Sequence, residues 1–197
     1  MKETLKTLLN RIPNGNIDHR FILAIDGLSR SGKTTLVEQI SQHLKGMGIP
    51  FFIFHIDDHI VERNKRYNTG NEEWYEYYCL QWDVDWLSQN FFHNLKHSQS
   101  FSLPYYDGET DTYSEHRISL PKACIIVVEG VFLQRKEWRS FFDYLVYLDC
   151  PRDKRFQRES DATKKNIEKF KTRYWKAEEY YVETENPIEK ADLVLNS

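Results

Sequence analysis

The feature that most constrains this chain is a glycine-rich loop between an apolar segment and an amphipathic one. After the apolar run FILAIDG, the residues GLSRSGKTT match the pattern G-x-x-x-x-G-K-[ST] at Gly27, Gly32, Lys33 and Thr34. Backbone N–H groups of such a loop surround phosphate oxygens, and the following helix presents its positive end to the same anion. The pattern is informative where it follows a strand and opens a helix, and the flanking segments predict both. We therefore expect a phosphate-binding loop for a nucleotide.

The residues of this loop have separate expected roles. Lys33 neutralises the β- and γ-phosphates, and the Thr34 hydroxyl binds Mg²⁺. The residues expected to contact the nucleotide are Gly27, Leu28, Ser29, Arg30, Ser31, Gly32, Lys33, Thr34 and Thr35. The loop by itself does not define the reaction, because kinases, ATPases, GTPases and switches all use it.

Four further apolar runs indicate buried strands. They are PFFIFHID, ACIIVVEG, DYLVYLD and a weaker one, ADLVLN. Helical candidates lie between them, at residues 33–45, 71–96 and 152–181. Parallel strands need crossover connections, and the connecting helices cover both faces of the sheet. We therefore predict an α/β chain with the P-loop NTPase fold, in which helices flank a doubly wound parallel sheet of five strands.

Residues 1–197 are expected to form a single domain, because no repeat and no low-complexity linker divides them. Leu5, Leu8, Leu9 and Ile12 follow helical spacing, and the helix breakers PNGN come next. Residues 1–19 are therefore interpreted as an N-terminal helix and turn. This helix is expected to pack on the outside of a core formed by residues 20–197.

Composition and charge indicate which kinds of partner the chain binds. The net charge is −3 and no long basic run is present, so we expect a small-molecule partner and no nucleic acid. The longest apolar run is far shorter than the ~20 residues that span a bilayer, and the first residues lack the apolar region of a signal peptide. Three cysteines without a Cys-x-x-Cys pair argue against disulfides and a structural zinc site. We expect a cytoplasmic protein with no membrane partner.

Acidic residues end four of the predicted strands, at Asp26, Asp57, Glu129 and Asp149. In open parallel sheets the ligand lies beyond the carboxyl ends of the strands, so these carboxylates are candidates for the site. Glu129, at the end of VVEG, is placed to bind Mg²⁺ directly or through water. A strand-end acid without a metal role is the alternative.

The stretch FHIDDHI admits three interpretations. His55 and His59 are four residues apart, a spacing that places two metal ligands on one face of a helix. The segment is instead expected to be a strand running into a loop, where side chains alternate between faces. A plain strand end and a catalytic carboxylate, Asp57 or Asp58, are the other two interpretations.

The order of several segments resembles the phosphoribulokinase and uridine kinase family of P-loop kinases. The matching segments are GLSRSGKTTL, HIDDHI, LPYYD, IIVVEGVFL, LDCPRDKRFQRESD and NPIEKADLVL. Only the first is specific by itself, and the order of all six carries the resemblance. The resemblance implies a P-loop kinase fold with a small helical lid and substrate region.

The resemblance implies phosphorylation of a small-molecule hydroxyl with ATP and Mg²⁺, most often the 5′-hydroxyl of a nucleoside. In that scheme Asp57 accepts the proton of the hydroxyl, with Asp58 as the second choice, and Lys33 holds the phosphates. Arg155 and Arg158 lie three apart on one face of a lid helix, where two guanidiniums can converge on the transferring phosphoryl group. A solvated basic helix face is the alternative.

The same resemblance implies an acceptor site. In relatives the Tyr of a Pro-x-Tyr-Asp segment and a later His contact the nucleoside base. Here the residues expected to bind the acceptor are Asp57, His59, Tyr106, Asp107, His116 and Arg117. His116 and Arg117 follow an apparent insertion, GETDTY, and Ile60 stands where many uridine kinases have Tyr. Residues 71–96, rich in Trp and Tyr, fall where the family places substrate-covering helices, although aromatic residues at helical spacing more often pack in the core.

Other acceptors and other function classes stay open. Pantothenate kinase and nicotinamide riboside kinase belong to the same group, so the acceptor is not defined. The group also includes several oligomeric forms, which makes a homo-oligomer one of the expected states. A P-loop ATPase without an acceptor, or a nucleotide-binding module, would use the same loop. A GTPase is disfavoured, because NKRY lacks the Asp of the guanine-reading Asn-Lys-x-Asp motif.

Overall fold

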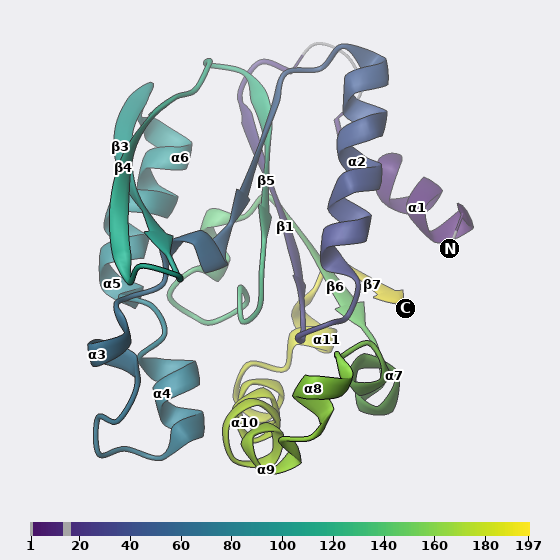
Figure 1. Cartoon of the computed structure of the whole chain (residues 1–197). Coiled ribbons are helices and arrows are strands. Elements are labelled where there is room, and N and C mark those ends of the chain that lie inside the picture. The colour runs from purple at the N-terminus through teal and green to yellow at the C-terminus, as the bar shows by residue number, and fades with distance from the viewer. Residues whose placement is uncertain (1, 14–16) are drawn as a thin grey trace.

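The fold is a parallel sheet between layers of helices. The computed structural model describes residues 2–13 and 17–197. The predicted turn PNGN includes residues 14–16, which lie outside the described residues. The five strands of the sheet are β1 Arg20–Gly27, β2 Phe51–His55, β5 Cys124–Glu129, β6 Tyr144–Asp149 and β7 Leu193–Asn196. They are parallel and lie in the order β2-β5-β1-β6-β7, which confirms the predicted fold class (Figure 1).

The central strand β1 is buried on both faces, as its continuous apolar sequence predicts. Leu23 and Ile25 point to one face, where they pack with Ile40 of helix α2. Ile22 points to the other face, where it belongs to a cluster that includes Phe92. The first face is covered by α1 Lys2–Leu9 and α2 Lys33–Met47. Two hydrophobic cores, one on each face, therefore hold the sheet and fix the carboxyl ends of its strands.

The predicted helical stretch at residues 71–96 is divided into several short helices. The elements on this side are α3 Arg63–Arg66, α4 Glu73–Cys79, α5 Val84–Leu87 and α6 His93–His97, with a π-helical turn at Ser88–Phe92. The break before α5 has a local cause, because the Asp83 carboxylate accepts a hydrogen bond from the backbone N–H of Trp86 and caps a new helix. Trp82, in the break, is only 2% exposed and packs in the core.

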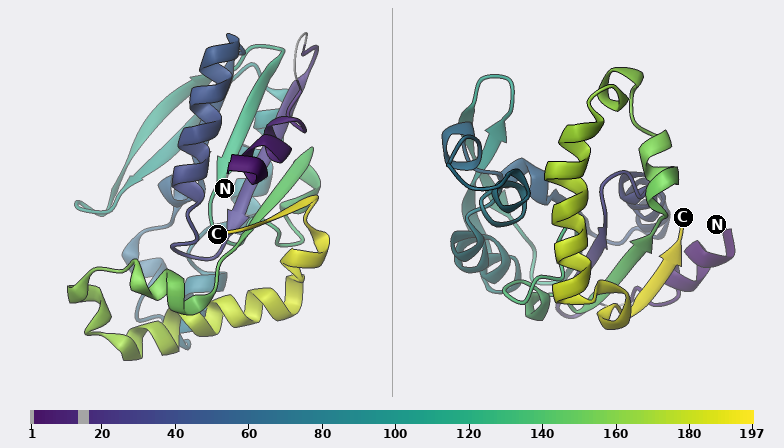
Figure 2. Two further views of the ribbon diagram at one scale, coloured as in Figure 1. Left: turned by 90° about the vertical axis from the view of Figure 1, so that its right-hand side faces the viewer. Right: turned by 90° about the horizontal axis from the view of Figure 1, so that it is seen from below.

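The predicted helix at residues 152–181 is also divided. The elements are α7 Arg152–Gln157, α8 Asp161–Lys164, α9 Ile167–Lys169, a π-helical turn at Phe170–Trp175, and α10 Lys176–Glu185, followed by α11 Pro187–Lys190. Ser160 and Asn166 each accept a hydrogen bond from a backbone N–H three residues later, which starts α8 and α9. These helices lie beyond the carboxyl ends of the strands (Figures 1 and 2). Among the described residues, every helix is too short or too polar to span a bilayer.

An antiparallel hairpin stands beside the main sheet and was not predicted. It consists of β3 Ser100–Asp107 and β4 Thr112–Ser119, paired along their whole length. The apparent insertion GETDTY forms its turn and the start of β4. Asp107 stabilises the turn by accepting hydrogen bonds from the N–H of Glu109 and the hydroxyl of Thr110. Asp111 has a left-handed backbone, with φ of 58°, which aspartate tolerates better than most residues.

Candidate active site

The phosphate loop connects β1 to α2, as predicted. Gly27 and Gly32 have φ angles of 150° and 103°, which side chains rarely adopt. A Cβ at Gly27 would also lie 2.8 Å from the carbonyl oxygen of Leu148 in the neighbouring strand. The two glycines are therefore required by backbone conformation and by close packing. The first turn of α2 presents exposed side chains of Thr34 and Thr35.

Lys33 lies across the loop and is only 7% exposed. Its Nζ donates a hydrogen bond to the carbonyl oxygen of Leu28 at 3.2 Å and lies 4.0 Å from Oε1 of Glu129. Burial lowers the pKa of Lys33, while the negative charges of Glu129, Asp26 and Asp57 oppose that shift. The ammonium group thus lies among carboxylates at the edge of the sheet, where it can neutralise phosphate oxygens.

Glu129 ends β5 and lies level with residues of both neighbouring strands. The register pairs it with Ile25 of β1 and His55 of β2. The Nδ1 atom of His55 lies 2.6 Å from Oε2 of Glu129, and this hydrogen bond raises the pKa of His55. The residue after Glu129 must be glycine, because a Cβ at Gly130 would collide with Ile56. Close packing therefore holds the segment that follows β2 against the end of β5.

The pair Asp57 and Asp58 lies in a 3₁₀ turn, Ile56–His59, directly after β2. Asp57 therefore lies two residues beyond the strand, whereas the sequence analysis placed it at the strand end. The Asp57 side chain is exposed on one side, while protein atoms surround it on the others. This desolvation raises the pKa of Asp57, the charge of Lys33 opposes the shift, and the charges of Glu129 and Asp58 add to it. An exposed carboxylate with a raised pKa is accessible to a ligand and is a stronger base than an ordinary aspartate.

The two histidines of FHIDDHI do not share a site. His55 is bound to Glu129, whereas His59 is 6% exposed and its Nδ1 donates to the carbonyl oxygen of Pro104 in β3. The donor on Nδ1 leaves Nε2 of His59 as an acceptor, and this atom is buried without a partner among the described residues. The interpretation of His55 and His59 as joint metal ligands is therefore wrong for this conformation.

The residues predicted to bind Mg²⁺ fit that ion. Thr34 is exposed at the start of α2, and its hydroxyl has no hydrogen-bond partner among the described residues. Oε1 of Glu129 faces Lys33, while His55 holds Oε2. Within the described residues no group of three or more His, Cys, Asp and Glu side chains is arranged around a metal position. This small set of oxygen ligands suits Mg²⁺, which keeps several waters and binds substrate phosphates.

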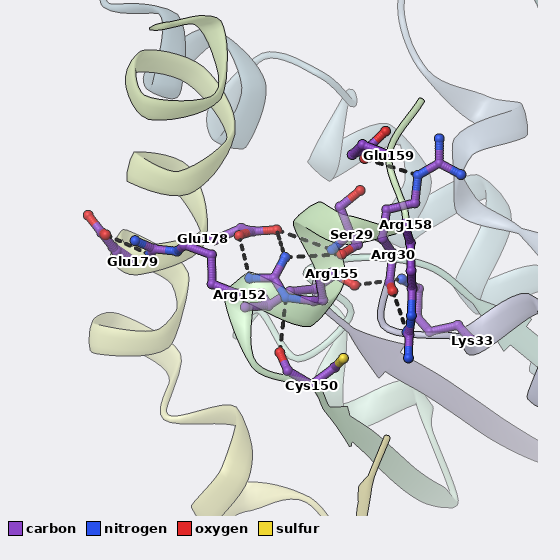
Figure 3. A network of polar contacts seen from close by, with 11 residues as sticks. Ser29, Arg30, Lys33, Cys150, Arg152, Arg155, Arg158, Glu159, Glu178 and Glu179 are labelled. Carbon is purple, nitrogen blue, oxygen red and sulfur yellow. Dashed lines mark hydrogen bonds and ion pairs between the residues drawn. The ribbon is translucent and has the colours of Figure 1, made fainter. Parts of the chain in front are cut away.

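The lid arginines differ from the prediction, because their guanidinium groups do not converge on one point. Arg155 is 5% exposed, and its donors bind the carbonyl oxygens of Cys150 and Ser29 and both carboxylate oxygens of Glu178 (Figure 3). Arg158 is exposed, and its Nη1 donates to the carbonyl oxygen of Arg30 at 2.7 Å. Arg155 therefore supports the loop, and Arg158 is the arginine that a ligand can reach.

Glu178 of α10 is a site residue that the sequence analysis missed. Its Oε1 accepts the N–H of Ser29 at 3.2 Å and also a hydrogen bond from Arg155 at 2.8 Å. Because Arg155 binds the carbonyl oxygen of the same serine, the ion pair holds both polar groups of one loop residue. Burial raises the pKa of Glu178, against the lowering effect of Arg155. Glu178 lies 23 residues after Arg155 in the sequence, so no local sequence pattern indicates that the two residues pair.

The predicted acceptor residues separate into two groups. Tyr106 donates to Asp111 at 2.7 Å and accepts from Arg66 at 3.1 Å, so its hydroxyl stabilises the hairpin. Asp107 is engaged in the hairpin turn. Arg117 is exposed and donates to the hydroxyl of Ser100 on the opposite strand. These three residues are therefore placed in the hairpin with protein partners.

The second group is a row of three rings between the 3₁₀ turn and the hairpin. The ring of Tyr105 lies 4.8 Å from that of His59 and is stacked at 4.4 Å on that of His116. His116 is exposed and lies 3.0 Å from the hydroxyl of Ser114. Tyr105 was not predicted, although it is adjacent to the Tyr106 that the motif indicated. The row adjoins the turn that carries the acidic pair, and it is the charge of Asp58 that acts on His59 and Tyr105.

The sequence and the fold of this chain are both similar to those of known proteins. Residues 22–196 match the sequence model of the phosphoribulokinase / uridine kinase family. The uridine kinase of Borrelia duttonii (strain Ly) is 30% identical over 186 residues, covering 88% of this chain and 85% of that protein. A solved structure of a possible uridine kinase from Bacillus stearothermophilus is 54% identical, with a TM-score of 0.86 and 98% of each chain covered.

More distant structures show the fold alone. The D-glycerate 3-kinase of Cryptococcus neoformans is 12% identical, with a TM-score of 0.54 over 84% of this chain and 77% of that one. The fold therefore does not select the acceptor. The family match, by contrast, extends from β1 to β7 and includes the loop, the turn with Asp57 and the lid. The chain belongs to the phosphoribulokinase / uridine kinase family of P-loop kinases.

Proposed function

We propose that this kinase transfers the γ-phosphoryl group of ATP to a hydroxyl of a small molecule, with the 5′-hydroxyl of a nucleoside as the leading acceptor. The observation that carries the proposal is the position of Asp57. It is an accessible carboxylate, coupled to the charges of Lys33 and Glu129, beyond strands that also position the phosphate loop. An ATPase needs a water-positioning group there, whereas a kinase needs a base for the acceptor hydroxyl.

Each residue has one part in the proposed transfer. Asp57 accepts the proton of the acceptor hydroxyl as that oxygen bonds to the γ-phosphorus and the bond to the β-phosphate oxygen breaks. The loop amides and Lys33 hold the phosphates and neutralise the charge that moves to the leaving oxygen. Arg158 is the exposed cation of the lid, and it binds the carbonyl oxygen of Arg30 and the hydroxyl of Ser197. A role at the transferring group would require its side chain to leave these partners. Thr34 and Glu129 would hold Mg²⁺, which when bound would supply further positive charge to the phosphates.

A nucleoside is supported by the named relatives and by the aromatic row. The relative from Borrelia duttonii is a uridine kinase. The stacked rings of Tyr105 and His116 provide aromatic surface on the acceptor side, which suits a flat heterocycle. Nicotinamide riboside has a ring of the same kind, whereas pantothenate has none. The ranking of acceptors is therefore uridine or cytidine first, nicotinamide riboside next and pantothenate last.

The proposal is tested by ADP release from MgATP with and without each candidate acceptor. Stimulation by a nucleoside, with a product phosphorylated at the 5′ position by ³¹P NMR, supports the proposal. Turnover that no acceptor changes would identify an ATPase. Binding of MgADP without turnover under any condition would identify a nucleotide-binding module. If pantothenate alone stimulated ADP release, the protein would still be a kinase, but the proposal that its acceptor is a nucleoside would be wrong.

A further inference from the structure

A cavity of about 470 Å³ opens beside the phosphate loop, away from Asp57. Its lining includes Gly32 and Thr35 of the loop and Gln39 of α2, but not Lys33, Asp57 or Glu129. In a phosphate loop the amides near the helix start bind the α- and β-phosphates, and the lysine reaches the β- and γ-phosphates. The cavity is therefore at the α-phosphate end, where the nucleoside part of the donor must leave the loop.

One wall of this cavity comes from outside the family core. Leu5 of α1 lines the cavity, although the family match begins only at residue 22. Helix α1 is held in place by Leu8 and Ile12, which are 0% and 2% exposed and belong to the same core cluster as Leu36 of α2. Figures 1 and 2 show α1 beside α2 and near the end of β7. Leu5 is only partly buried, so an apolar side chain remains open on the cavity side of a well-anchored helix.

We propose that Leu5 is a base-contacting residue of the donor site, so that α1 forms part of the nucleotide pocket in this chain. The inference rests on the proposed function, because it requires a nucleotide on the loop. The ligand class is a planar heterocycle joined to a polyphosphate. Leu5 and Leu195 supply apolar surface for the faces of the ring, and the amides of Gln39 and Asn196 can pair with its edge.

Arg158 gives this cavity a planar group on which a base can stack. Its guanidinium group lines the same cavity and is exposed, and guanidinium planes stack on aromatic rings. The cavity volume lies within the range of small-molecule sites. A guanidinium can bind a phosphate as well as a ring, whereas apolar side chains such as Leu5 and Leu195 cannot bind a phosphate. The composition of the walls therefore favours the base over the phosphates.

The test separates base binding from phosphate binding. Isothermal titration measures the Kd of Leu5→Ala for MgADP and for magnesium tripolyphosphate, which has no base. We expect the Kd for MgADP to rise about threefold to tenfold, since Leu5→Ala removes part of an apolar side chain that the base would bury. The Kd for tripolyphosphate stays within about twofold, because its contacts are with the loop.

A matched variant on the same helix controls for the stability of α1. Leu9→Ala makes the same chemical change at a partly buried residue that packs on the core and does not line the cavity. It is expected to leave both constants unchanged. Leu5→Met, which keeps the apolar length of the side chain, is expected to restore the Kd for MgADP to within about twofold of the unsubstituted value.

Three results would overturn the inference. They are an unchanged Kd for MgADP in Leu5→Ala, an equal loss of MgADP and tripolyphosphate binding, and a loss in Leu9→Ala as large as that in Leu5→Ala. Failure of the unsubstituted protein to bind either ligand has a different meaning, because it would contradict the proposed function itself. Thermal unfolding of each variant shows whether α1 and the core remain folded.

Discussion

Arg155 of α7 and Glu178 of α10 form a buried ion pair with two hydrogen bonds, at 2.8 and 2.9 Å, and together they hold the N–H and carbonyl groups of Ser29. Their side chains are 6% and 3% exposed, so neither charge has much water to stabilise it. The contribution of a buried ion pair to stability depends more on whether all of its hydrogen-bonding groups have partners than on the attraction between the two charges. The lid and the phosphate loop are therefore joined through the backbone of one residue, Ser29.

The first prediction concerns this pair. Glu178→Gln leaves the Arg155 charge buried without a counter-charge, and we expect the free energy of unfolding to fall by about 3 kcal/mol. Replacing both residues by apolar ones of similar size, Arg155→Met with Glu178→Leu, is expected to recover only part of that loss, because backbone groups of Ser29 and Cys150 then lose their partners. Urea denaturation followed by circular dichroism measures the three values.

The same two helices provide the control for this prediction. Arg152 and Glu179 form an ion pair at 2.7 Å, but their side chains are 43% and 53% exposed. Glu179→Gln is expected to cost less than about 1 kcal/mol, because water screens an exposed pair. If Glu178→Gln proved no more destabilising than Glu179→Gln, the buried pair would not be a structural link.

The strands and the phosphate loop could be predicted because their signals are local. A strand such as Cys124–Glu129, buried at every position, needs a continuous apolar run. Gly27 and Gly32 are required by their own backbone angles, so their spacing alone indicates the loop. The acids at the strand ends followed from the same reasoning, and Glu129 does end its strand beside the loop.

The parts that could not be predicted depend on contacts between distant segments. A buried arginine has the same local sequence as a surface arginine, and the partner of Arg155 lies on another helix. The hairpin strand Thr112–Ser119 is exposed along nearly its whole length, so no apolar alternation marks it. The helix breaks depend on Ser160 and Asn166 capping new helices, where polar side chains compete with a continuous helix.

The second prediction addresses the proposed base. Asp57→Asn keeps the size of the side chain but cannot accept the proton, so kcat should fall by about 10²- to 10⁴-fold. The Kd for MgADP should stay nearly unchanged, because the loop holds the phosphates. Acceptor-dependent ADP release and isothermal titration measure the two quantities. A parallel loss of MgADP affinity and kcat would point to a metal-binding role for Asp57 instead.

The third prediction concerns the support behind the loop. Tyr181 is fully buried, and its hydroxyl donates to Asp26 and accepts the N–H of Gln134. Tyr181→Phe leaves that N–H without an acceptor and should lower the free energy of unfolding by about 1–3 kcal/mol. The matched control is Tyr180→Phe at an exposed neighbour, which should cost less than about 0.5 kcal/mol.

The pH dependence of the Tyr181→Phe loss follows from Asp26. Burial raises the pKa of Asp26, and the hydrogen bond from Tyr181 partly lowers it again. Removing that bond raises the folded-state pKa further, so ionising Asp26 in the folded protein becomes harder. The extra cost is absent while Asp26 stays protonated in both folded proteins, and it grows as pH rises through the raised folded-state pKa of Asp26 in the unsubstituted protein. Denaturation followed from acidic to alkaline pH should therefore show a loss that increases with pH, and a loss that is the same at every pH would contradict the role of Asp26.

The last prediction concerns the acid limb of the pH–rate profile. Asp57 must be ionised to accept a proton, and its raised pKa places the inflection of kcat above the pH at which an ordinary aspartate titrates. Asp58 adds to that shift through its negative charge, whereas Lys33 opposes it. Asp58→Asn should therefore keep kcat at pH 7.5 within about fivefold and move the inflection to lower pH. Asp85→Asn, at an exposed aspartate of α5, should leave the inflection in place. A large loss of kcat in Asp58→Asn, with Asp57→Asn still active, would reverse the assignment of the base.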